Sequence, residues 1–561
     1  MKKIVLLYII LISIQIQAQQ KKDSLNTQVI EVTHSFEPKV QDAYKLDVNP
    51  DVGQVTEQKI PVTYAIQSVP VASTFSPEKG GMTGFNAKST IEEVKNSYVS
   101  LAGGNYLQIF GDAYLYYPVT DNLETAIRLK HYSSQGQQVD DGISYDPFSH
   151  TKADLLFGYK AEKSHWNFDM GYKGDKSHFK ELFPLGPAFP GTVQKIYNYK
   201  FSKNNFNLDV EGTFKDLFIK DLSVSYNNYW DVYQNNENDF HLLGNLIFPV
   251  GNIDLRLGLQ TDLVTGDIGK VGILDPKTDA KITYKNMDFG LLPAVQIEND
   301  KLVVNIGAKI FYQNQDTLYK SVQFIPDVKL NFNLIYEKLT VNAGVTGDLK
   351  QNAYHQFIQN NPYLISQNNI LPTLIPYDIF GGFNGAFSSA FSYEVKLGFR
   401  RIKNYGFYSF SNTYAADYNL VYDDMNQSYF STAFNIGVGK KLDVKLHLNY
   451  YKNDTDQLSK ALMLPEFEFK SSLIFMPTDK LNFSADLLSM GNRIPDATSG
   501  NTLSGFTDLN LGVRYNINKQ FTAFVQANNV LNKSYQYFYY YPVQKLQIMG
   551  GVSYRFDIPH N

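Results

Sequence analysis

Histidines and carboxylates are the residues of this chain whose types could support metal binding or acid–base chemistry. The nine histidines are scattered, and none stands at the His-x-x-x-His spacing that places two imidazoles on one metal ion. Two acidic runs, Tyr422–Gln427 and Asn453–Gln457, contain oxygen ligands, but neither has the Gly and terminal Glu of an EF-hand loop. We therefore expect two solvated extracellular loops there, with no metal and no other cofactor.

Nucleophilic catalysis has no visible basis in this sequence. There is no nucleophile elbow and no Ser/His/Asp arrangement, and neither His131 nor His447 has a serine partner that the sequence can place. The cysteine count of zero removes disulfides, thiolate metal sites and cysteine nucleophiles. We predict that the protein is not an enzyme.

Charged residues instead recur at every second position of long stretches. In "NIDLRLGLQTDL" the leucines fall on one face, and Asp254, Arg256, Gln260 and Asp262 fall on the other. "KLDVKLHLNY", "DLNLGVRYNI" and the final "KLQIMGGVSYRF" repeat the arrangement. The candidate residues on the polar face are Asp254, Arg256, Gln260, Asp262, Lys445, His447, Arg514 and Arg555.

Strict alternation over eight or more residues indicates strands rather than helices. The strands are joined in pairs by short polar links such as "TDN" and "TDK", and longer polar loops separate the pairs. Short turns on one side and long loops on the other are typical of outer-membrane barrels. At about 20 residues per strand with its share of loop, residues 91–556 predict an all-β, transmembrane antiparallel barrel of about 22 strands, with about 20 to 26 tolerable.

The alternation also predicts what each face contacts. In such a barrel the apolar face contacts lipid and the small or polar face lines the lumen. The last strand should pair with the first, because closure removes both exposed edges. Tyr and Phe at strand ends should form interfacial girdles, and the run Ser534–Val543 is expected to be one segment of such a girdle. A soluble all-β protein would also alternate, but its strands are usually about 5–6 residues long.

The N-terminus predicts export. Lys2 and Lys3 precede the apolar run Ile4–Ile14, and Ala18 offers a cleavage site, so residues 1–18 are expected to be a signal peptide. An N-terminal membrane helix is the alternative, but the run is shorter than the roughly 20 residues that span a bilayer. A net charge of −4 gives no reason to expect nucleic acid. We expect an integral outer-membrane protein that contacts lipid and the barrel-assembly machinery.

The C-terminal stretch resembles the end of TonB-dependent receptors. In that family an element of the form N-N-x-x-[ND]-K-x-Y precedes the last loop, and a Gly-rich strand ending in an aromatic residue follows it. The matching residues here are Asn528, Asn529, Asn532, Lys533, Tyr535 and Phe556. The resemblance implies the receptor-type barrel and a role in transport across the outer membrane, with TonB as a partner. The tail 557–561 departs from the family, whose assembly signal usually ends on the aromatic residue.

A second departure lies before the barrel. Family members carry a globular plug there, whereas residues 19–90 are rich in Pro, Val and Thr and lack the plug motifs. We expect an extended segment, periplasmic or lodged in the lumen, and a barrel without a complete plug. Within it, Val29, Ile30 and Val32 form a β-prone stretch that is either a TonB box, which pairs with TonB as an added strand, or a plain tether.

Three functions remain open from the sequence. The first is transport of a ligand across the outer membrane. The second is a non-transporting scaffold that binds an outer-membrane lipoprotein or secretion partner, and the third is a passive porin. A wide barrel normally has its lumen filled, so we expect the N-terminal segment, inward loops or a partner to occlude it.

Overall fold

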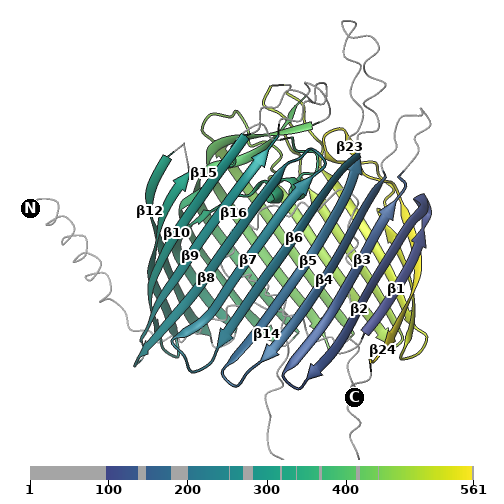
Figure 1. Cartoon of the computed structure of the whole chain (residues 1–561), viewed down its shortest axis with the longest axis horizontal. Helices are drawn as coiled ribbons and strands as arrows, with labels where there is room; N and C mark the ends of the chain where they lie inside the picture. Colours follow the sequence, from purple (N-terminus) through teal and green to yellow (C-terminus); the bar gives the residue numbers. More distant parts are fainter. Residues whose placement is uncertain are drawn as a thin grey trace, which may run out of the picture.

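The computed structural model describes most of the chain after residue 96. The described ranges are residues 97–136, 147–178, 200–251, 253–269, 282–315, 319–335, 338–365, 369–388, 390–411, 417–439, 441–498 and 500–558. The predicted signal peptide, the segment 19–90 and the TonB-box candidate lie outside these residues. The barrel is seen from the side in Figure 1.

Twenty-two antiparallel strands form the wall in chain order. They are β1 (Ser97–Gly104), β2 (Gln108–Thr120), β3 (Leu123–Ser134), β4 (Phe148–Lys160), β5 (Ser164–His178), β6 (Lys200–Phe214), β7 (Ile219–Asp231), β8 (Asn236–Val250), β9 (Ile253–Ile268), β10 (Ile282–Glu298), β11 (Leu302–Gln315), β12 (Tyr319–Ile335), β13 (Leu339–Lys350), β14 (Thr373–Ser388), β15 (Phe391–Ser411), β16 (Asp417–Val438), β17 (Leu442–Thr455), β18 (Phe467–Thr478), β19 (Leu481–Met490), β20 (Phe506–Asn516), β21 (Phe521–Asn528) and β24 (Gln547–Phe556). A separate two-stranded sheet contains β22 (Gln536–Phe538) and β23 (Tyr541–Pro542), and the helical elements are η1 (Asn105–Leu107) and α2 (Tyr354–Asn360).

The wall closes on itself. β1 pairs with β24 from Ser97 opposite Phe556 to Gly104 opposite Met549. Closure leaves no edge strand in the wall, so its backbone donors and acceptors can pair with a neighbouring strand throughout. The predicted strand number of about 22 and the predicted pairing of the last strand with the first are both confirmed, although β24 begins at Gln547 rather than Lys545.

The two rims differ as the loop lengths predict. The start of β1 and the end of β24 meet at one rim, which also carries short turns such as residues 121–122 and 479–480. We call this the turn rim. The opposite rim, here called the loop rim, carries the long connections 351–372, 456–466, 491–505 and 529–546. Figure 1 shows these connections gathered over one end of the barrel.

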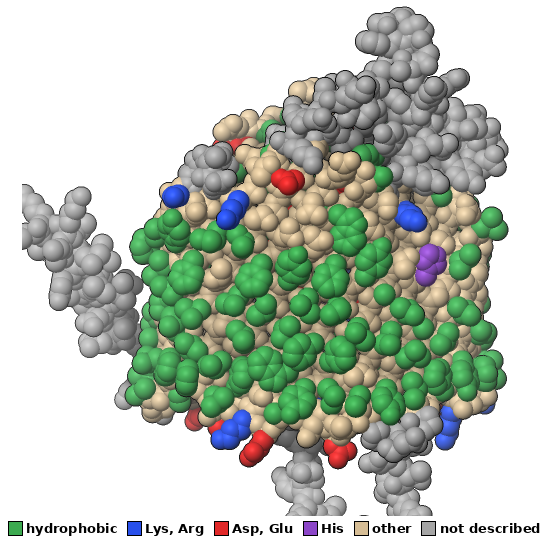
Figure 2. Space-filling view, viewed as in Figure 1, with side chains coloured by type: hydrophobic (Ala, Val, Ile, Leu, Met, Phe, Trp, Pro, Cys, Tyr) green, Lys and Arg blue, Asp and Glu red, His purple; other side chains and the backbone are tan. Residues whose placement is uncertain are grey.

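The outer surface of the wall is apolar. Figure 2 shows a broad band of hydrophobic side chains across the face of the barrel in view, with charged side chains gathered near the two rims. On β9, Ile253 and Leu255 are exposed. Asp254 and Arg256, which alternate with them, are half-buried on the other face. An outward apolar band flanked by polar rims is the surface that a bilayer requires. Within the described residues, no helix has the length and hydropathy needed to cross a membrane.

Two expectations about aromatic and acidic segments are wrong. Ser534–Val543 is not an outer girdle: Tyr537, Phe538 and Tyr541 are at most 3% exposed and belong to an internal cluster. The acidic runs are not loops either, because most of each run lies within β16 or β17, which pair side by side. Arg401 of β15 forms ion pairs with Asp424 and Asp456.

Candidate functional site at the loop rim

The connection between β13 and β14 crosses the mouth of the barrel. We call its described residues, 351–365 and 369–372, the strap. A single helix, α2, begins at Tyr354 and ends at Asn360, and its Tyr354, His355 and Ile358 are buried. A seven-residue helix is too short to be stable alone, so contacts with the wall must hold it.

Glu237 of β8 holds the beginning of α2. Its carboxylate accepts hydrogen bonds from the backbone N–H groups of Tyr354 at 2.6 Å and His355 at 2.9 Å. The Nδ1 atom of His355 lies 2.8 Å from the same carboxylate. Glu237 has no exposed surface. A buried carboxylate is tolerated when donors surround it, and here it takes the place of an N-cap side chain, which Ala353 lacks.

Tyr284 of β10 completes the shell around Glu237. Its hydroxyl donates to the Glu237 carboxylate, and its ring packs against Gly266 on the neighbouring strand β9. A Cβ atom at position 266 would overlap that ring. The glycine therefore creates the space in which an aromatic ring covers the strand, an arrangement known from cross-strand aromatic–glycine pairs.

The other end of α2 is held by a lysine and a tyrosine. Lys203 of β6 is 7% exposed, and its Nζ donates to the carbonyl oxygen of Ile358 at 3.1 Å. Tyr408 of β15 donates its hydroxyl to the carbonyl of Phe357 at 2.9 Å. An anion at the N-terminus and a cation at the C-terminus both complement the helix dipole. The wall thus fixes α2 at both ends through hydrogen bonds.

The strap then continues to the far side of the wall. Ile365 donates its N–H to the carbonyl of Tyr418 on β16, and the N–H of Tyr418 donates to the carbonyl of Tyr363. Closer to β14, Asn286 of β10 donates to the carbonyl of Ile370. β6 and β16 stand on nearly opposite sides of the wall. The strap therefore spans the mouth.

A large aromatic cluster fills the space beneath and beside the strap. Tyr418 has no exposed surface, and its hydroxyl accepts the N–H of Tyr539 from the last connection. Arg493 of the connection 491–505 donates to the carbonyls of Gln536 and Tyr537. Three connections that are remote in sequence thus share one core, which is the reason that the run Ser534–Val543 is internal.

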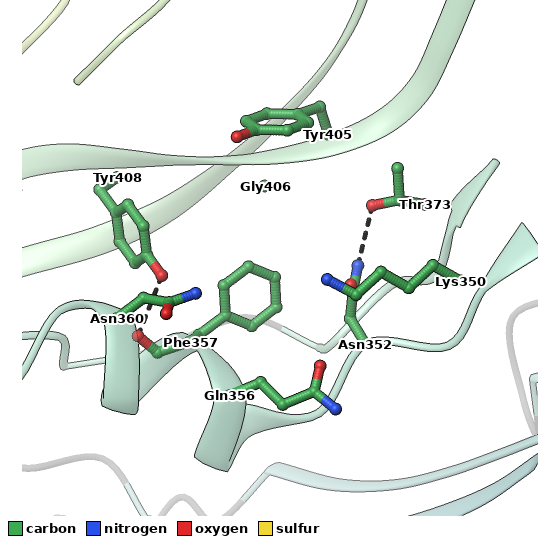
Figure 3. A pocket seen from close by; sticks show the side chains of 9 residues that line it. All are labelled: Lys350, Asn352, Gln356, Phe357, Asn360, Thr373, Tyr405, Gly406 and Tyr408. Atoms are coloured by element: carbon green, nitrogen blue, oxygen red, sulfur yellow. Dashed lines mark hydrogen bonds between the residues drawn. The ribbon is translucent and has the colours of Figure 1, made fainter. Parts of the chain in front are cut away.

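A pocket lies between α2 and the part of β15 that rises above the wall (Figure 3). Phe357 stands at its centre, with its ring against the backbone of Gly406. Its lining residues are Lys350, Asn352, Gln356, Phe357, Asn360, Thr373, Tyr405, Gly406 and Tyr408. Amides, hydroxyls and ring faces dominate this lining, and no carboxylate belongs to it. Together with Lys350, they give the pocket several hydrogen-bonding groups beside its ring faces.

The predicted polar-face residues of β9 lie together on one face. Asp254 and Arg256 form an ion pair at 3.5 Å, and Gln260 donates to Asp262 at 2.8 Å. Asp262 also accepts from His241 of β8. The structure does not bring these residues into the pocket at the strap. They form a network along the wall.

The remaining predicted polar-face residues lie on other strands. Lys445 lies 3.8 Å from Asp443, and half-buried His447 stands opposite Ala433 and Lys470 in the register. Arg514 and Arg555 are half-buried and alternate with exposed Val513 and Tyr554. None of the four contacts the strap through a described hydrogen bond or ion pair. That these residues line the lumen stays a prediction.

The C-terminal motif residues have structural positions. Asn529 has a left-handed backbone (φ 50°), and its side chain donates to the carbonyls of Lys533 and Gln544. Asn528 donates to Gln547. The ring of Tyr535 stacks on Phe506 at 4.1 Å between centroids. Asn528, Asn529, Lys533 and Tyr535 thus shape the last connection, and Phe556 lies at the seam with Ser97.

Sequence reasoning missed the strap and its anchors. The loop was recognised only by its length, although Tyr354 and Ile358 stand at the i, i+4 spacing of one helix face. Glu237 had no signal of its own, because its partners are remote in sequence. Within the described residues, no group of three or more His, Asp or Glu side chains is arranged to hold a metal ion.

Comparisons with known proteins show similarity in structure. No protein-family model matches the chain, and no curated protein matches its sequence. The ferripyoverdine receptor of the outer membrane of Pseudomonas aeruginosa is 14% identical, with a TM-score of 0.61 over 82% of this chain and 72% of that one. The FrpB iron transporter from Neisseria meningitidis is 11% identical, with a TM-score of 0.63 over 82% of each chain.

The siderophore receptor PirA from Acinetobacter baumannii is 11% identical, with a TM-score of 0.61 over 82% of this chain and 80% of that one. At such low identity the similarity concerns the fold. The resemblance to TonB-dependent receptors seen in the C-terminal motif is confirmed at that level. The chain has the fold of these receptors and transporters, a closed antiparallel barrel of 22 strands.

Proposed function

We propose that this protein is an outer-membrane barrel that takes part in moving a ligand across the outer membrane, with the strap controlling access to its lumen. The observation that carries the proposal is the closed 22-stranded wall, which superposes on receptor and transporter barrels over 82% of the chain. These similar structures are receptors and transporters rather than enzymes, in keeping with the absence of a recognised catalytic arrangement in the sequence.

The strap helps to distinguish transport from the two alternative functions, porin and scaffold. A passive porin needs a lumen open at both rims, and a connection anchored from β6 to β16 disfavours that. A scaffold barrel would also be closed at its mouth, and it remains the second candidate. The two differ in energy coupling, because a TonB-dependent transporter must contact TonB and a scaffold need not.

The proposed TonB contact is the segment around Val29, Ile30 and Val32. Its β-prone residues suit the addition of an extended strand to a sheet edge of the partner. In this proposal residues 19–90 occupy the place of the plug, and the mature chain is delivered by the signal peptide to the barrel-assembly machinery. A lipoprotein partner belongs to the scaffold alternative.

The test uses cells that produce the full chain with Val32→Cys. Because the natural sequence has no cysteine, a single engineered thiol reports one position. A disulfide or bifunctional cross-link to a cysteine in the TonB C-terminal domain is expected if the protein is energised. Absence of the cross-link, with a known receptor cross-linking in the same cells, would favour the scaffold.

A second measurement addresses the lumen. The purified full chain should show no steady conductance in a planar bilayer, and replacement of residues 351–372 by a short turn should open it. A large steady conductance of the unmodified protein would establish the porin instead. If the strap deletion is silent, a further deletion of residues 19–90 tests whether that segment occludes the lumen.

A further inference from the structure

The contact that holds the beginning of α2 contains two carboxylates and one imidazole. Nδ1 of His355 lies 2.8 Å from Glu237, and Nε2 lies 3.9 Å from Asp239 on the same wall strand. The side chains of His355, Glu237 and Asp239 are 9%, 0% and 15% exposed. We call these three residues the latch. Water reaches them poorly, so their charges interact strongly.

The protonation state of the imidazole decides whether the latch is attractive. With both nitrogens protonated, His355 donates toward Glu237 and faces Asp239 with a positive charge. Loss of the Nε2 proton leaves a lone pair directed at the Asp239 carboxylate and removes the only positive charge of the three residues. The latch would then hold two negative charges in a nearly dry site, which is costly.

Other groups packed around His355 set the strength of this effect. The charged and titratable groups that face it or its partners are Tyr354 on α2, Glu237, Asp239 and His241 on β8, Asp262 on β9, Tyr229 and Asp231 on β7, Tyr284 on β10, Lys203 on β6 and Lys173 on β5. The tyrosine hydroxyls of Tyr284 and Tyr229 donate to Glu237 and Asp231, so they are neutral donors. Lys173 and Lys203 are the lysines of the set.

We propose that the strap is a gate and that loss of a proton from His355 releases it, by breaking the contact between α2 and the wall strand β8. The proposal goes beyond ligand transport, because it concerns how the mouth opens in any of the functions considered. Lys203 at the other end of α2 lies outside the latch and keeps the strap attached on one side.

The direction of the pH effect follows from the electrostatics. Burial lowers the pKa of His355, but its hydrogen bond with Glu237 and the charges of Glu237 and Asp239 outweigh burial and raise the pKa above its ordinary value of 6.5. A raised pKa in the closed state means that the latch is strongest while the imidazole is protonated and both carboxylates are ionised, and that it is lost as pH rises from about 6.5 through the raised value. Alkaline medium should therefore open the gate.

Hydrogen exchange of the Tyr354 and His355 amides tests the gate in the full chain. Each measured rate is divided by the intrinsic rate at the same pH, so that only opening of the strap is reported. We expect protection to fall by up to about tenfold per pH unit between about pH 6.5 and the raised pKa, and to level off above the raised pKa. The amides of the wall strand β9 should keep their protection throughout.

Three substitutions distinguish titration of the latch from a general loss of strap stability. His355→Gln keeps a donor toward Glu237 but cannot titrate, so the pH dependence of strap protection should disappear. Asp239→Asn removes one attractive charge, so the midpoint of opening should move to lower pH while the barrel stays folded. Glu298→Gln, an exposed carboxylate at the turn rim, is the matched control and should change nothing.

The results that overturn the proposal are equally specific. Unchanged strap protection across the alkaline range in the natural sequence would show that the strap is not a proton-released gate. Persistent pH dependence in His355→Gln would assign the titration to another group. If the midpoint of opening stays fixed in Asp239→Asn, the three residues do not act together as a latch, even if His355 titrates.

Discussion

The ring of Tyr363 stacks on the ring of Tyr541 with 3.4 Å between centroids and 14° between planes. Tyr363 belongs to the strap, and Tyr541 belongs to the connection between β21 and β24. Phe538 meets the ring of Tyr363 edge-on. The far end of the strap is therefore fixed by the last connection of the chain as well as by the wall, so closure of the mouth depends on two loops that the sequence keeps far apart.

Truncation of this stack should free the far end of the strap. Tyr541→Ala removes a buried ring, and losses of about 3–5 kcal/mol are usual for such truncations. We expect the Ile365 amide, which donates to Tyr418 of β16, to lose hydrogen-exchange protection while the wall strands keep theirs. Tyr515→Ala removes an exposed outer ring and serves as the control. Equal loss of protection in both variants would contradict a specific stack.

Gly266 should be necessary for the position of Tyr284. In Gly266→Ala the new methyl group would occupy the place of the Tyr284 ring and push its hydroxyl away from Glu237. A buried carboxylate that loses one donor is destabilised by about 1–3 kcal/mol. Strap protection at Tyr354 should fall by the corresponding factor.

Gly381→Ala is the matched control for that substitution, because a Cβ atom there would meet only a backbone oxygen at 4.0 Å. It should leave the strap unchanged. If Gly266→Ala behaves like the control, Tyr284 adjusts without loss and does not contribute to holding α2.

The orientation of the wall can be tested with one arginine on each face. Leu291 lies near the middle of β10, is 37% exposed and belongs to the outer apolar band. Leu291→Arg should destabilise the barrel folded in lipid vesicles by about 2–4 kcal/mol, the usual penalty near the bilayer midplane. Gln260→Arg, on the opposite face of the adjacent strand at almost the same level, should cost far less. Similar penalties for both variants would mean that the polar face is not solvated.

The proposed TonB segment predicts sensitivity to proline. Ile30→Pro removes a backbone donor that an added strand would need. Cross-linking from Val32→Cys to TonB should fall about fivefold to about thirtyfold if one or two backbone hydrogen bonds of about 1 kcal/mol each are lost. Ile30→Val keeps the donor and the β-branch and should cross-link normally. Undiminished cross-linking in the proline variant would show that the segment does not bind TonB as a strand.

Much of the wall could be predicted from the sequence because the signal is local. Side chains alternate along a strand with a period of two, so "NIDLRLGLQTDL" by itself separates Leu255 from Asp254 and Arg256. The short turns and the final strand with its small residues then predicted pairing, closure and approximate strand number. These features require no knowledge of which distant residues meet.

Which residues fill the mouth of the barrel depends on the tertiary structure and could not be predicted from the sequence. Closure of the barrel places Lys203, Glu237 and Tyr284 on one stretch of rim, and only there can they satisfy the two ends of a helix from residues 354–360. Tyr537, Phe538 and Tyr541 have the composition of a girdle, yet they pack inward because the strap offers Tyr363 as a partner. Their apolar composition determines that such rings are buried away from water. Which apolar surface they reach, lipid outside or a loop core inside, is decided by contacts between segments that lie far apart in the chain.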